Sequence, residues 1–269
     1  MPEQDDNRDS RNTPKPADNE EQKQPLDDRN LTETPHGAGF RKTAFDRPPG
    51  GRGQRPDRWI YLHGFLSGPV SQRALFFRDK LATAGLPCEF PDLNTPNFEK
   101  STISSRLERV DDLIDSHPKL ARIGIIGSDI GGLLAILAAG PRRNVRSLFL
   151  MGPTLSLFRE NFIGLGKAGM RHWERTRCVD FFHRVLNANR TLEWDFVQDA
   201  RQYNESIIDI SIPMTIVHGT RDEMVDSHHS AEYAQSRGNV SLHLLEDDQS
   251  LHTSITEVWD LFWRANRPR

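Results

Sequence analysis

The chain has 269 residues and a formal net charge of -3 at pH 7, with 36% hydrophobic and 27% charged residues. This length suits one or two globular domains, and the nearly balanced charge gives no general electrostatic reason to expect nucleic-acid binding. No stretch approaches the roughly 18 to 20 uninterrupted apolar residues of a membrane-spanning helix, and the polar start MPEQDDNRDS does not resemble a signal peptide. Two cysteines, Cys88 and Cys178, are too few for a disulfide framework or a zinc site, and we expect both to be structural. We therefore expect a cytoplasmic protein with neither a nucleic-acid nor a membrane partner.

The first 57 residues differ in composition from the rest. Segments such as PEQDDNRDSRNTPKPADNEEQKQ and RPPGGRGQRPD combine charges of both signs with Pro, Gly, Asn and Gln, and contain almost no aliphatic side chains. Such a composition buries too little apolar surface to offset the entropy lost on ordering. We predict a disordered N-terminal tail over residues 1–57. An interaction arm built on its basic GGRGQR stretch is the less favoured alternative.

From residue 58 onward, short apolar runs alternate with longer amphipathic segments. The runs have the length and composition of strands at 59–62, 87–90, 123–126, 147–151, 214–217 and 240–245. Apolar residues at helical spacing lie between or after them, at Ile103, Leu107, Val110 and Ile114, and at Ile255, Val258, Trp259 and Phe262. This alternation predicts an α/β domain over residues 58–269, with a mostly parallel sheet and helices on both faces. Ligand sites in such sheets lie at the carboxyl ends of the strands.

One interval between predicted strands is too long for a single crossover. About sixty residues separate the runs 147–151 and 214–217. Among them are the large aromatic residues Phe158, Phe162, Trp173, Phe181, Phe182 and Trp194. We expect residues 153–212 to form a helical cap inserted at the carboxyl end of the sheet, where it would cover the site and decide what fits beneath it. In the alternative, individual aromatic residues only attach the insertion to the body.

The sequence GSDIGG at 127–132 follows the apolar run RIGII and precedes the apolar segment LLAILAAG. Small residues lie two positions before and two positions after Asp129. The sharp strand-to-helix turn called a nucleophile elbow requires this pattern, because its backbone folds back on itself. Ser128 as the nucleophile would place Ile126 and Ile130 at these flanks, and both are β-branched and too bulky. Asp129 is therefore the residue predicted at the tip of the turn.

Three further strand ends carry polar motifs. HGFLSGP at 63–69 contains Gly64, whose backbone freedom permits a sharp turn that exposes N–H groups. HGTRDEMV at 218–225 places Asp222 on a loop, the usual place for the acid of a hydrolase triad. EDDQSLH follows the last apolar run, where the triad histidine is expected.

Taken in order, the four motifs resemble those of the α/β-hydrolase superfamily, and specifically its small bacterial carboxylesterases, which read HGF, GSSxGG, HGxxDxxV and DDHxL. The resemblance extends from residue 58 to the end of the chain and implies an α/β-hydrolase fold. It assigns the nucleophile position to Asp129, the acid to Asp222, the histidine position to Gln249 and the oxyanion-hole N–H groups to Phe65 and Ile130. Serine and histidine are usual where Asp129 and Gln249 stand, so this chain departs from the pattern twice.

These departures conflict with ester hydrolysis. Serine-esterase chemistry needs a hydroxyl nucleophile and a base that takes and returns its proton, and a glutamine amide cannot serve as this base at neutral pH. Haloalkane dehalogenases and epoxide hydrolases of the superfamily use an aspartate that forms an alkyl-enzyme ester, but a histidine-activated water must then hydrolyse it. His252, three residues beyond Gln249, is the candidate replacement base, and its other interpretation is an exposed or capping residue. His63 and His218 resemble packing histidines.

The glutamine also leaves two carboxylates without the ring that normally separates them. Either its amide donates to both Asp129 and Asp222, or the two charges raise one pKa so that a proton is retained. A divalent cation held by these two residues with Asp247 or Asp248 is a third alternative, but the pattern has no recognised metal-ligand spacing. We predict neither a metal nor a cofactor.

Two interpretations of the function follow. The preferred one is a pseudoenzyme, a hydrolase-fold protein that has lost esterase chemistry and keeps its pocket for a small ligand or a partner. The alternative is an active hydrolase that uses Asp129 as nucleophile, or as a base activating water, on an apolar substrate beneath the cap. The position of His252 discriminates: a ring within hydrogen-bond reach of Asp129 or Asp222 favours the alternative, and a ring in solvent favours the first. The ligand and the oligomeric state are left open.

Overall fold

The computed structural model describes residues 55–155, 157, 165–208 and 210–266. The predicted N-terminal tail therefore lies almost entirely outside the described residues, as do Phe158 and Phe162 of the predicted cap. Asp57, at the end of that tail, already bonds to the body. Its N–H donates to the carbonyl of Arg122 at 2.8 Å, and its carboxylate lies 3.3 Å from the Arg122 guanidinium.

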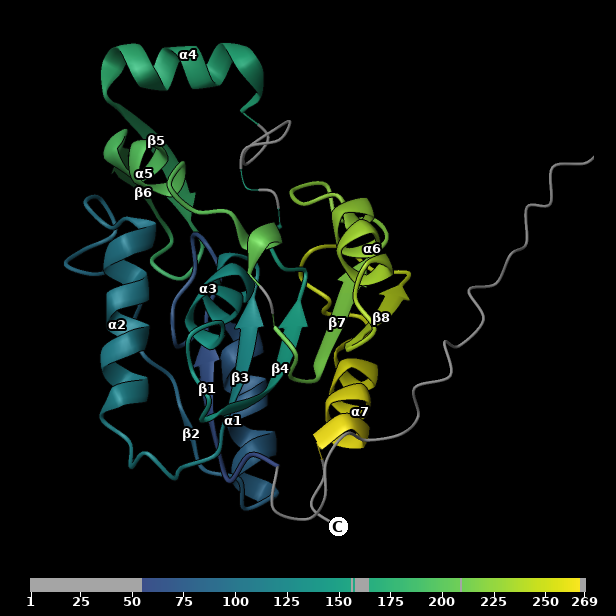
Figure 1. Ribbon diagram of the computed structural model, residues 1–269. Coiled ribbons are helices and arrows are strands. Elements are labelled where there is room, and N and C mark those ends of the chain that lie inside the picture. The colour runs from purple at the N-terminus through teal and green to yellow at the C-terminus, as the bar shows by residue number, and fades with distance from the viewer. Residues whose placement is uncertain (1–54, 156, 158–164, 209, 267–269) are drawn as a thin grey trace, which may run out of the picture. The chain divides into compact units, whose positions relative to one another are not determined.

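A six-stranded parallel sheet forms the centre of this body (Figure 1). Its strands in spatial order are β2 (Cys88–Glu89), β1 (Arg58–Leu62), β3 (Ile123–Ser128), β4 (Val145–Met151), β7 (Met214–Gly219) and β8 (Val240–Leu245). Each strand coincides with a predicted apolar run. β3 is buried along its whole length, as expected for a central strand covered on both faces. The prediction of an α/β domain with a mostly parallel sheet is confirmed.

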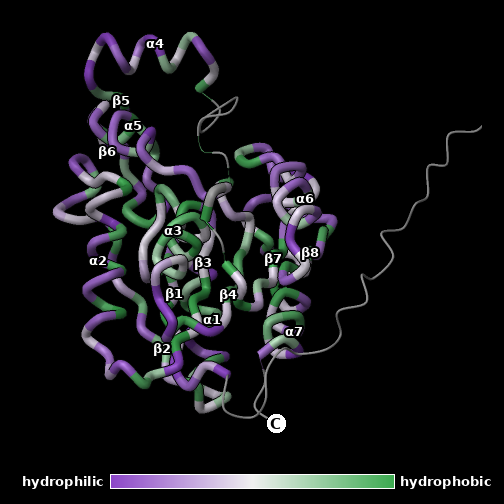
Figure 2. The backbone as a smooth tube through the Cα atoms, in the orientation of Figure 1, coloured by the Kyte–Doolittle hydropathy of each residue, from purple (hydrophilic) through white to green (hydrophobic). Residues whose placement is uncertain are grey.

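Helices cover both faces of the sheet. They are α1 (Gln72–Thr83), α2 (Ile103–Asp115), α3 (Ile130–Ala139), α6 (Ser227–Gln235) and α7 (Ile255–Asn266). Alternate residues of β1 supply two separate cores, because successive side chains of a strand point to opposite faces. Ile60 and Leu62 belong to the core that includes α2 and α3, whereas Trp59 and Tyr61 belong to the core that includes α1 and α7. Figure 2 shows the apolar residues concentrated in the central strands and α3.

The insertion between β4 and β7 is present, but it is not wholly helical. It contains α4 (Gly166–Thr176), the antiparallel pair β5 (Cys178–His183) and β6 (Ala188–Glu193), α5 (Asp195–Ala200) and a short 3-10 helix, η2 (Glu205–Ile207). Along β5, Val179, Phe181 and His183 are more buried than the residues between them. This period of two is typical of a strand with one covered face, so the insertion that was expected to be a helical cap also contains a β-hairpin.

Aromatic residues attach the insertion to the body. Trp173, Trp194 and Phe181 are buried, and the Trp173 ring lies 5.6 Å from that of Trp194 and 5.5 Å from that of Phe181, measured between centroids. The Phe181 ring lies 5.4 Å from that of Phe65, in the loop after β1. Phe182 is exposed. For these buried rings, the packing role that we considered as the alternative is what the contacts show.

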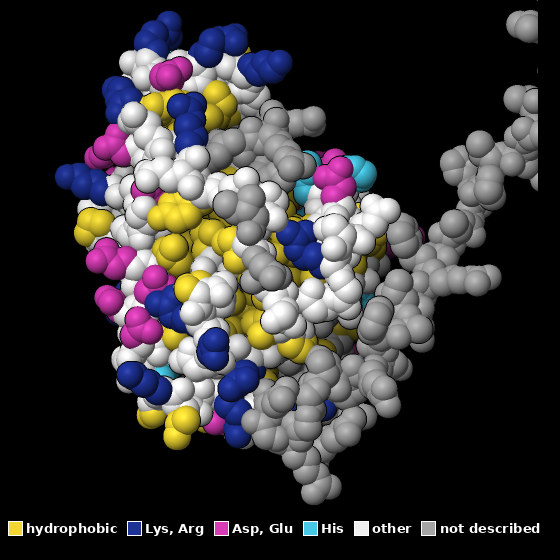
Figure 3. Space-filling model, viewed as in Figure 1, with side chains coloured by type: hydrophobic (Ala, Val, Ile, Leu, Met, Phe, Trp, Pro, Cys, Tyr) yellow, Lys and Arg dark blue, Asp and Glu magenta, His cyan; other side chains and the backbone are white. Residues whose placement is uncertain are grey.

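The outer surface of α4 carries several basic side chains. α4 buries Trp173 and exposes Lys167, Arg171 and Arg175, and Figure 3 shows Lys and Arg side chains gathered over this helix.

Among the residues that the structure describes, no helix has both the length and the apolar character needed to cross a membrane.

Candidate active site

Asp129 stands between β3 and α3, and its backbone is strained. Its φ of 53° and ψ of -120° lie outside the regions that residues with a Cβ normally occupy. The surrounding backbone fixes this conformation. The Asp129 N–H donates to the carbonyl of Met151 at 3.0 Å, and its own carbonyl accepts from the N–H groups of Gly132 at 2.8 Å and Thr154 at 3.1 Å. Such strain persists where neighbouring structure over-determines the conformation, and here it holds the Asp129 side chain towards the cavity.

Glycines allow the close approaches around this turn. A Cβ added to Gly127, two residues before Asp129, would lie 2.6 Å from the carbonyl oxygen of Gly131 and 2.7 Å from the Cα of Gly132. A Cβ added to Gly64 would lie 2.9 Å from the Cβ of Asp129. The small residues on which the elbow was predicted are therefore sterically required.

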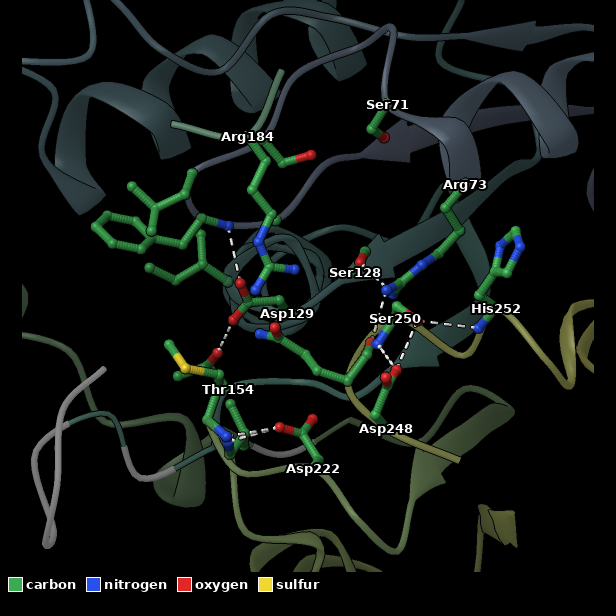
Figure 4. Close-up of a pocket in the computed structure, with 18 of the residues that line it drawn as sticks. Ser71, Arg73, Ser128, Asp129, Thr154, Arg184, Asp222, Asp248, Ser250 and His252 are labelled. Atoms are coloured by element: carbon green, nitrogen blue, oxygen red, sulfur yellow. Dashed lines mark hydrogen bonds between the residues drawn. The ribbon is translucent and has the colours of Figure 1, made fainter. Parts of the chain in front are cut away.

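Two donors hold the carboxyl group of Asp129 (Figure 4). Its Oδ2 accepts from the N–H of Phe65 at 2.9 Å, and its Oδ1 accepts a hydrogen bond from the Thr154 hydroxyl. Phe65 was predicted as an oxyanion-hole residue. The other predicted donor, Ile130, is the first residue of α3, so its N–H is one of the orphan donors at the helix N-terminus. Thr154 was not predicted, although it follows the end of β4, and applying the strand-end rule there would have found it.

Burial raises the pKa of Asp129 above the usual range of an aspartate, and the nearby charge of Asp222 acts in the same direction. The hydrogen bonds from Thr154 and Phe65 and the positive charge of Arg73 oppose this shift. The carboxyl group therefore holds its proton to a higher pH than an exposed aspartate does.

Replacement of Asp129 by asparagine is expected to gain stability relative to the native protein as the pH rises. Because the folded pKa of Asp129 is raised above its unfolded value of about 3.9, the proton stabilises the folded state, and this contribution is lost as the pH rises through the folded pKa. Asparagine has no such proton to lose. The free energy of unfolding of Asp129→Asn minus that of the native protein should increase between about pH 4 and pH 8 in urea titrations. A difference that is constant or falls over this range would contradict the raised pKa.

Asp222 lies on the loop after β7, with its side chain fully buried. Its Oδ1 accepts from the N–H groups of Met224 and Val225, each at 2.9 Å. Its Oδ2 makes no hydrogen bond with any described residue, and Nε2 of His218 lies 3.4 Å away. Both nitrogens of the buried His218 ring have other partners, the Ser230 hydroxyl at 2.7 Å and the Val225 carbonyl at 3.0 Å. The packing role expected for His218 agrees with these contacts.

The other candidate histidines do not lie between the two aspartates. His63 is buried, with Nε2 accepting from the N–H of Leu93 at 3.0 Å and Nδ1 bonded to the carbonyl of Gly64 at 3.0 Å. His252 is exposed, and Figure 4 shows its ring directed away from Asp129. It makes no hydrogen bond with Asp129 or Asp222. By the criterion stated above, its position favours the interpretation without esterase chemistry.

Gln249 follows β8 and lines the same cavity as Asp129 and Asp222. The cavity has a volume of about 1400 Å³. Arg73, from α1, binds two of the strand ends: its Nη1 donates to the Ser128 hydroxyl and its Nη2 to the carbonyl of Gln249, each at 2.7 Å. Ser128 is thus tied to Arg73 and does not occupy the tip of the turn.

Arg184 also enters this cavity, from the turn between β5 and β6 (Figure 4). Neither Arg73 nor Arg184 was predicted as a site residue. No motif marks them, because a helix and a hairpin turn outside the four strand-end motifs bring them to the cavity.

The two acidic residues considered as extra metal ligands shape their own loop. Asp247 accepts from the N–H groups of Asp248 at 2.8 Å and Ser254 at 2.7 Å. Asp248 accepts from the N–H of Ser250 at 2.7 Å and from its hydroxyl at 2.5 Å, and these bonds lower its pKa. Within the described part of the chain, no group of three or more His, Cys, Asp and Glu side chains is arranged to hold a metal ion.

The parallel sheet, the strained turn after β3 and the loops after β7 and β8 define the fold as that of an α/β hydrolase. The family model of an uncharacterised protein family, UPF0227, matches residues 58–252, and the chain belongs to this family. No curated protein sequence gives a significant match.

Solved structures share this fold. One is a protein from Agrobacterium vitis S4 that carries a hydrolase designation, with 20% identity, a TM-score of 0.66 and coverage of 82% of this chain and 91% of that one. Est1E from Butyrivibrio proteoclasticus, solved with ferulic acid bound, has 19% identity, a TM-score of 0.63 and coverage of 81% and 92%. Mouse alpha/beta hydrolase domain-containing protein 10 has 19% identity, a TM-score of 0.59 and coverage of 76% and 88%. At these identities the likeness establishes the fold alone.

Proposed function

We propose that the protein is an α/β-hydrolase-fold binding protein with a degenerate triad, which binds a small ligand and does not hydrolyse esters. The observation that carries this proposal is the placement of the Asp129 carboxyl group. Its Oδ2 takes the N–H of Phe65, the donor that would otherwise hold the carbonyl oxygen of an ester. A substrate would have to displace this hydrogen bond in order to bind there.

The absence of a base at the histidine position supports the same proposal. Asp222 keeps one buried carboxylate oxygen without a hydrogen-bond partner among the described residues, and no described histidine donates to it. Gln249 cannot take a proton from a nucleophile at neutral pH. His252 is exposed, and the rings of His63 and His218 are committed to structural bonds.

One observation favours an active hydrolase as the second candidate. The strained turn still presents a carboxyl group to a cavity that is partly apolar. Attack of Asp129 on the carbon of an epoxide or a haloalkane would break the C–O bond of the ring or the carbon–halogen bond, leaving an alkoxide or a halide ion and an ester on Asp129 itself. The N–H of Phe65 would then face the oxygen that becomes the oxyanion during hydrolysis. Without a base to activate water, this chemistry would stop at the ester.

The insertion at residues 153–212 acts in this proposal as the cap that selects the ligand. Leu157 and Arg184 of the insertion line the cavity and support this role. We place the protein in the cytoplasm, with a small molecule as its partner and without a cofactor, a nucleic acid or a membrane.

Intact-protein mass and product release, measured together, test the proposal. The full chain is incubated with p-nitrophenyl butyrate, styrene oxide and 1-bromohexane, with Asp129→Asn as the control. We expect neither turnover nor a mass adduct above those of the control. Turnover that disappears in Asp129→Asn would refute the proposal and establish the active hydrolase. A stable adduct on Asp129 without turnover would show a nucleophile that cannot complete the reaction.

A further inference from the structure

Two arginines line the cavity together with five carboxylates. Arg73 and Arg184 come from elements far apart in the sequence, and both reach the cavity that contains Asp129 (Figure 4). Among the described residues, no ion pair joins either guanidinium group to a carboxylate. The charge of Arg73 acts on Asp129 and that of Arg184 acts on Asp248. Each guanidinium group nevertheless has N–H donors that no described residue accepts, and these donors are the reason to expect an anionic group in the ligand.

Arg73 is held ready to bind an anion. Its two hydrogen bonds, to the Ser128 hydroxyl and the Gln249 carbonyl, use one N–H of each terminal nitrogen. A guanidinium has five N–H donors in a fixed plane, so further donors remain. Both of its present hydrogen-bond acceptors are uncharged, although its charge also acts on Asp129.

Arg184 reaches the same cavity from the insertion. It stands on the turn between β5 and β6, and Figure 4 shows its guanidinium group directed into the cavity above Asp129. Its side chain is exposed and makes no hydrogen bond with any described residue, although its charge acts on Asp248.

Most acidic residues of the cavity already have internal donors. Asp129 accepts from Phe65 and Thr154, Asp222 accepts from two backbone N–H groups, and Asp248 accepts from Ser250. Asp226, at the start of α6, accepts from the N–H of His228 at 2.8 Å. Glu223 is exposed. The guanidinium groups of Arg73 and Arg184, in contrast, have N–H donors without an acceptor among the described residues.

An apolar rim adjoins the arginines. Val70 and Leu75 line the cavity with 54% and 39% of their surfaces exposed, and Phe76, Leu155 and Leu157 line it as well. Large apolar side chains left open at a cavity are expected where a ligand covers them.

We propose that the cavity binds a small organic carboxylate, with the carboxylate group between Arg73 and Arg184 and an apolar body against the rim of Val70 and Leu75. This inference rests on the proposed function and names the ligand class. Planar guanidinium groups match the two oxygens of a carboxylate in bidentate geometry, which gives recognition as well as affinity.

Isothermal titration of the full chain with matched probes tests the proposal. The probes are 4-phenylbutyrate, its uncharged amide and acetate, which compare the anion with an isostere and with an anion that lacks an apolar body. We expect 4-phenylbutyrate to bind at least about 10-fold more tightly than either, the effect expected from hydrogen bonds to a charged group. Arg184→Gln should weaken the binding of 4-phenylbutyrate by about 10-fold and leave the binding of the amide unchanged.

Arg109→Gln is the matched control, because Arg109 is an exposed arginine of α2 outside the cavity. It should bind all three probes as the native protein does. Arg73→Gln should also lose the preference for the carboxylate, and Arg184→Gln keeps the test decisive if loss of the Arg73 bonds disturbs folding. The proposal would be overturned if 4-phenylbutyrate binds no more tightly than its amide or acetate. It would also be overturned if Arg184→Gln keeps the preference for the acid over the amide, or if no probe binds at all. None of these results concerns ester turnover, so the two proposals fail separately.

Discussion

The double variant Asp129→Ser/Gln249→His is expected to hydrolyse p-nitrophenyl butyrate. Two further groups would serve the reaction: the N–H of Phe65 faces the tip of the turn, and Asp222 has a buried carboxylate oxygen without a hydrogen-bond partner among the described residues. A histidine at position 249 would donate to that oxygen and take the proton of the new serine. Because triad residues act as a unit, and losing one costs on the order of 10⁴- to 10⁶-fold in rate, the double variant should exceed either single variant by at least about 10³-fold.

Product release at a fixed enzyme concentration measures this gain. The single variants Asp129→Ser and Gln249→His serve as controls and should remain at the background rate. Adding Asp222→Asn to the double variant should return the activity towards that of the single variants, because the histidine would lose its orienting carboxylate. A double variant that is folded but inactive would mean that Gln249 does not occupy the histidine position.

Replacement of Gly127 by alanine is expected to reduce the free energy of unfolding by about 3 kcal/mol or more. The new Cβ would lie 2.6 Å from the carbonyl oxygen of Gly131 and 2.7 Å from the Cα of Gly132, and both are backbone atoms that cannot rotate away. The strained turn would have to shift, and with it the side chain of Asp129.

Gly238→Ala is the matched control for this overlap. Gly238 lies in the exposed turn before β8, where an added Cβ would meet nothing within 4 Å. Both substitutions reduce the entropy of the unfolded chain equally, so the difference between them reports the steric overlap alone. Urea denaturation of both variants gives this difference. Equal stabilities would show that the turn has room for a side chain at position 127.

The sheet and the turn could be predicted from the sequence because their signals are local. Apolar runs mark buried parallel strands, and small residues around Asp129 are required by the contacts of the same short segment. The hairpin β5–β6 gave no comparable signal. Its strand Ala188–Glu193 is largely polar, and its structure depends on packing against the buried aromatic rings of the insertion.

The candidate site could be predicted only where a strand end carries its residue. Asp129, Asp222 and Gln249 follow β3, β7 and β8, and all three line one cavity. Arg73 and Arg184 reach that cavity through the packing of a helix and a hairpin, which no spacing in the sequence encodes. The direction of the His252 ring likewise depends on how the loop after β8 turns.

The backbone at position 129 has a consequence for how this fold changes its chemistry. Neighbouring peptide groups and glycines set its φ of 53° and ψ of -120°, and the side chain itself forms no helix-capping bond. The turn therefore holds whatever residue occupies position 129 at the same point of the cavity. Substitution of this one residue can place a hydroxyl, a thiol or a carboxylate there without a change in the rest of the fold. Gain or loss of reactivity then requires only a change of the side chain at position 129, because the surrounding backbone already maintains the strained conformation.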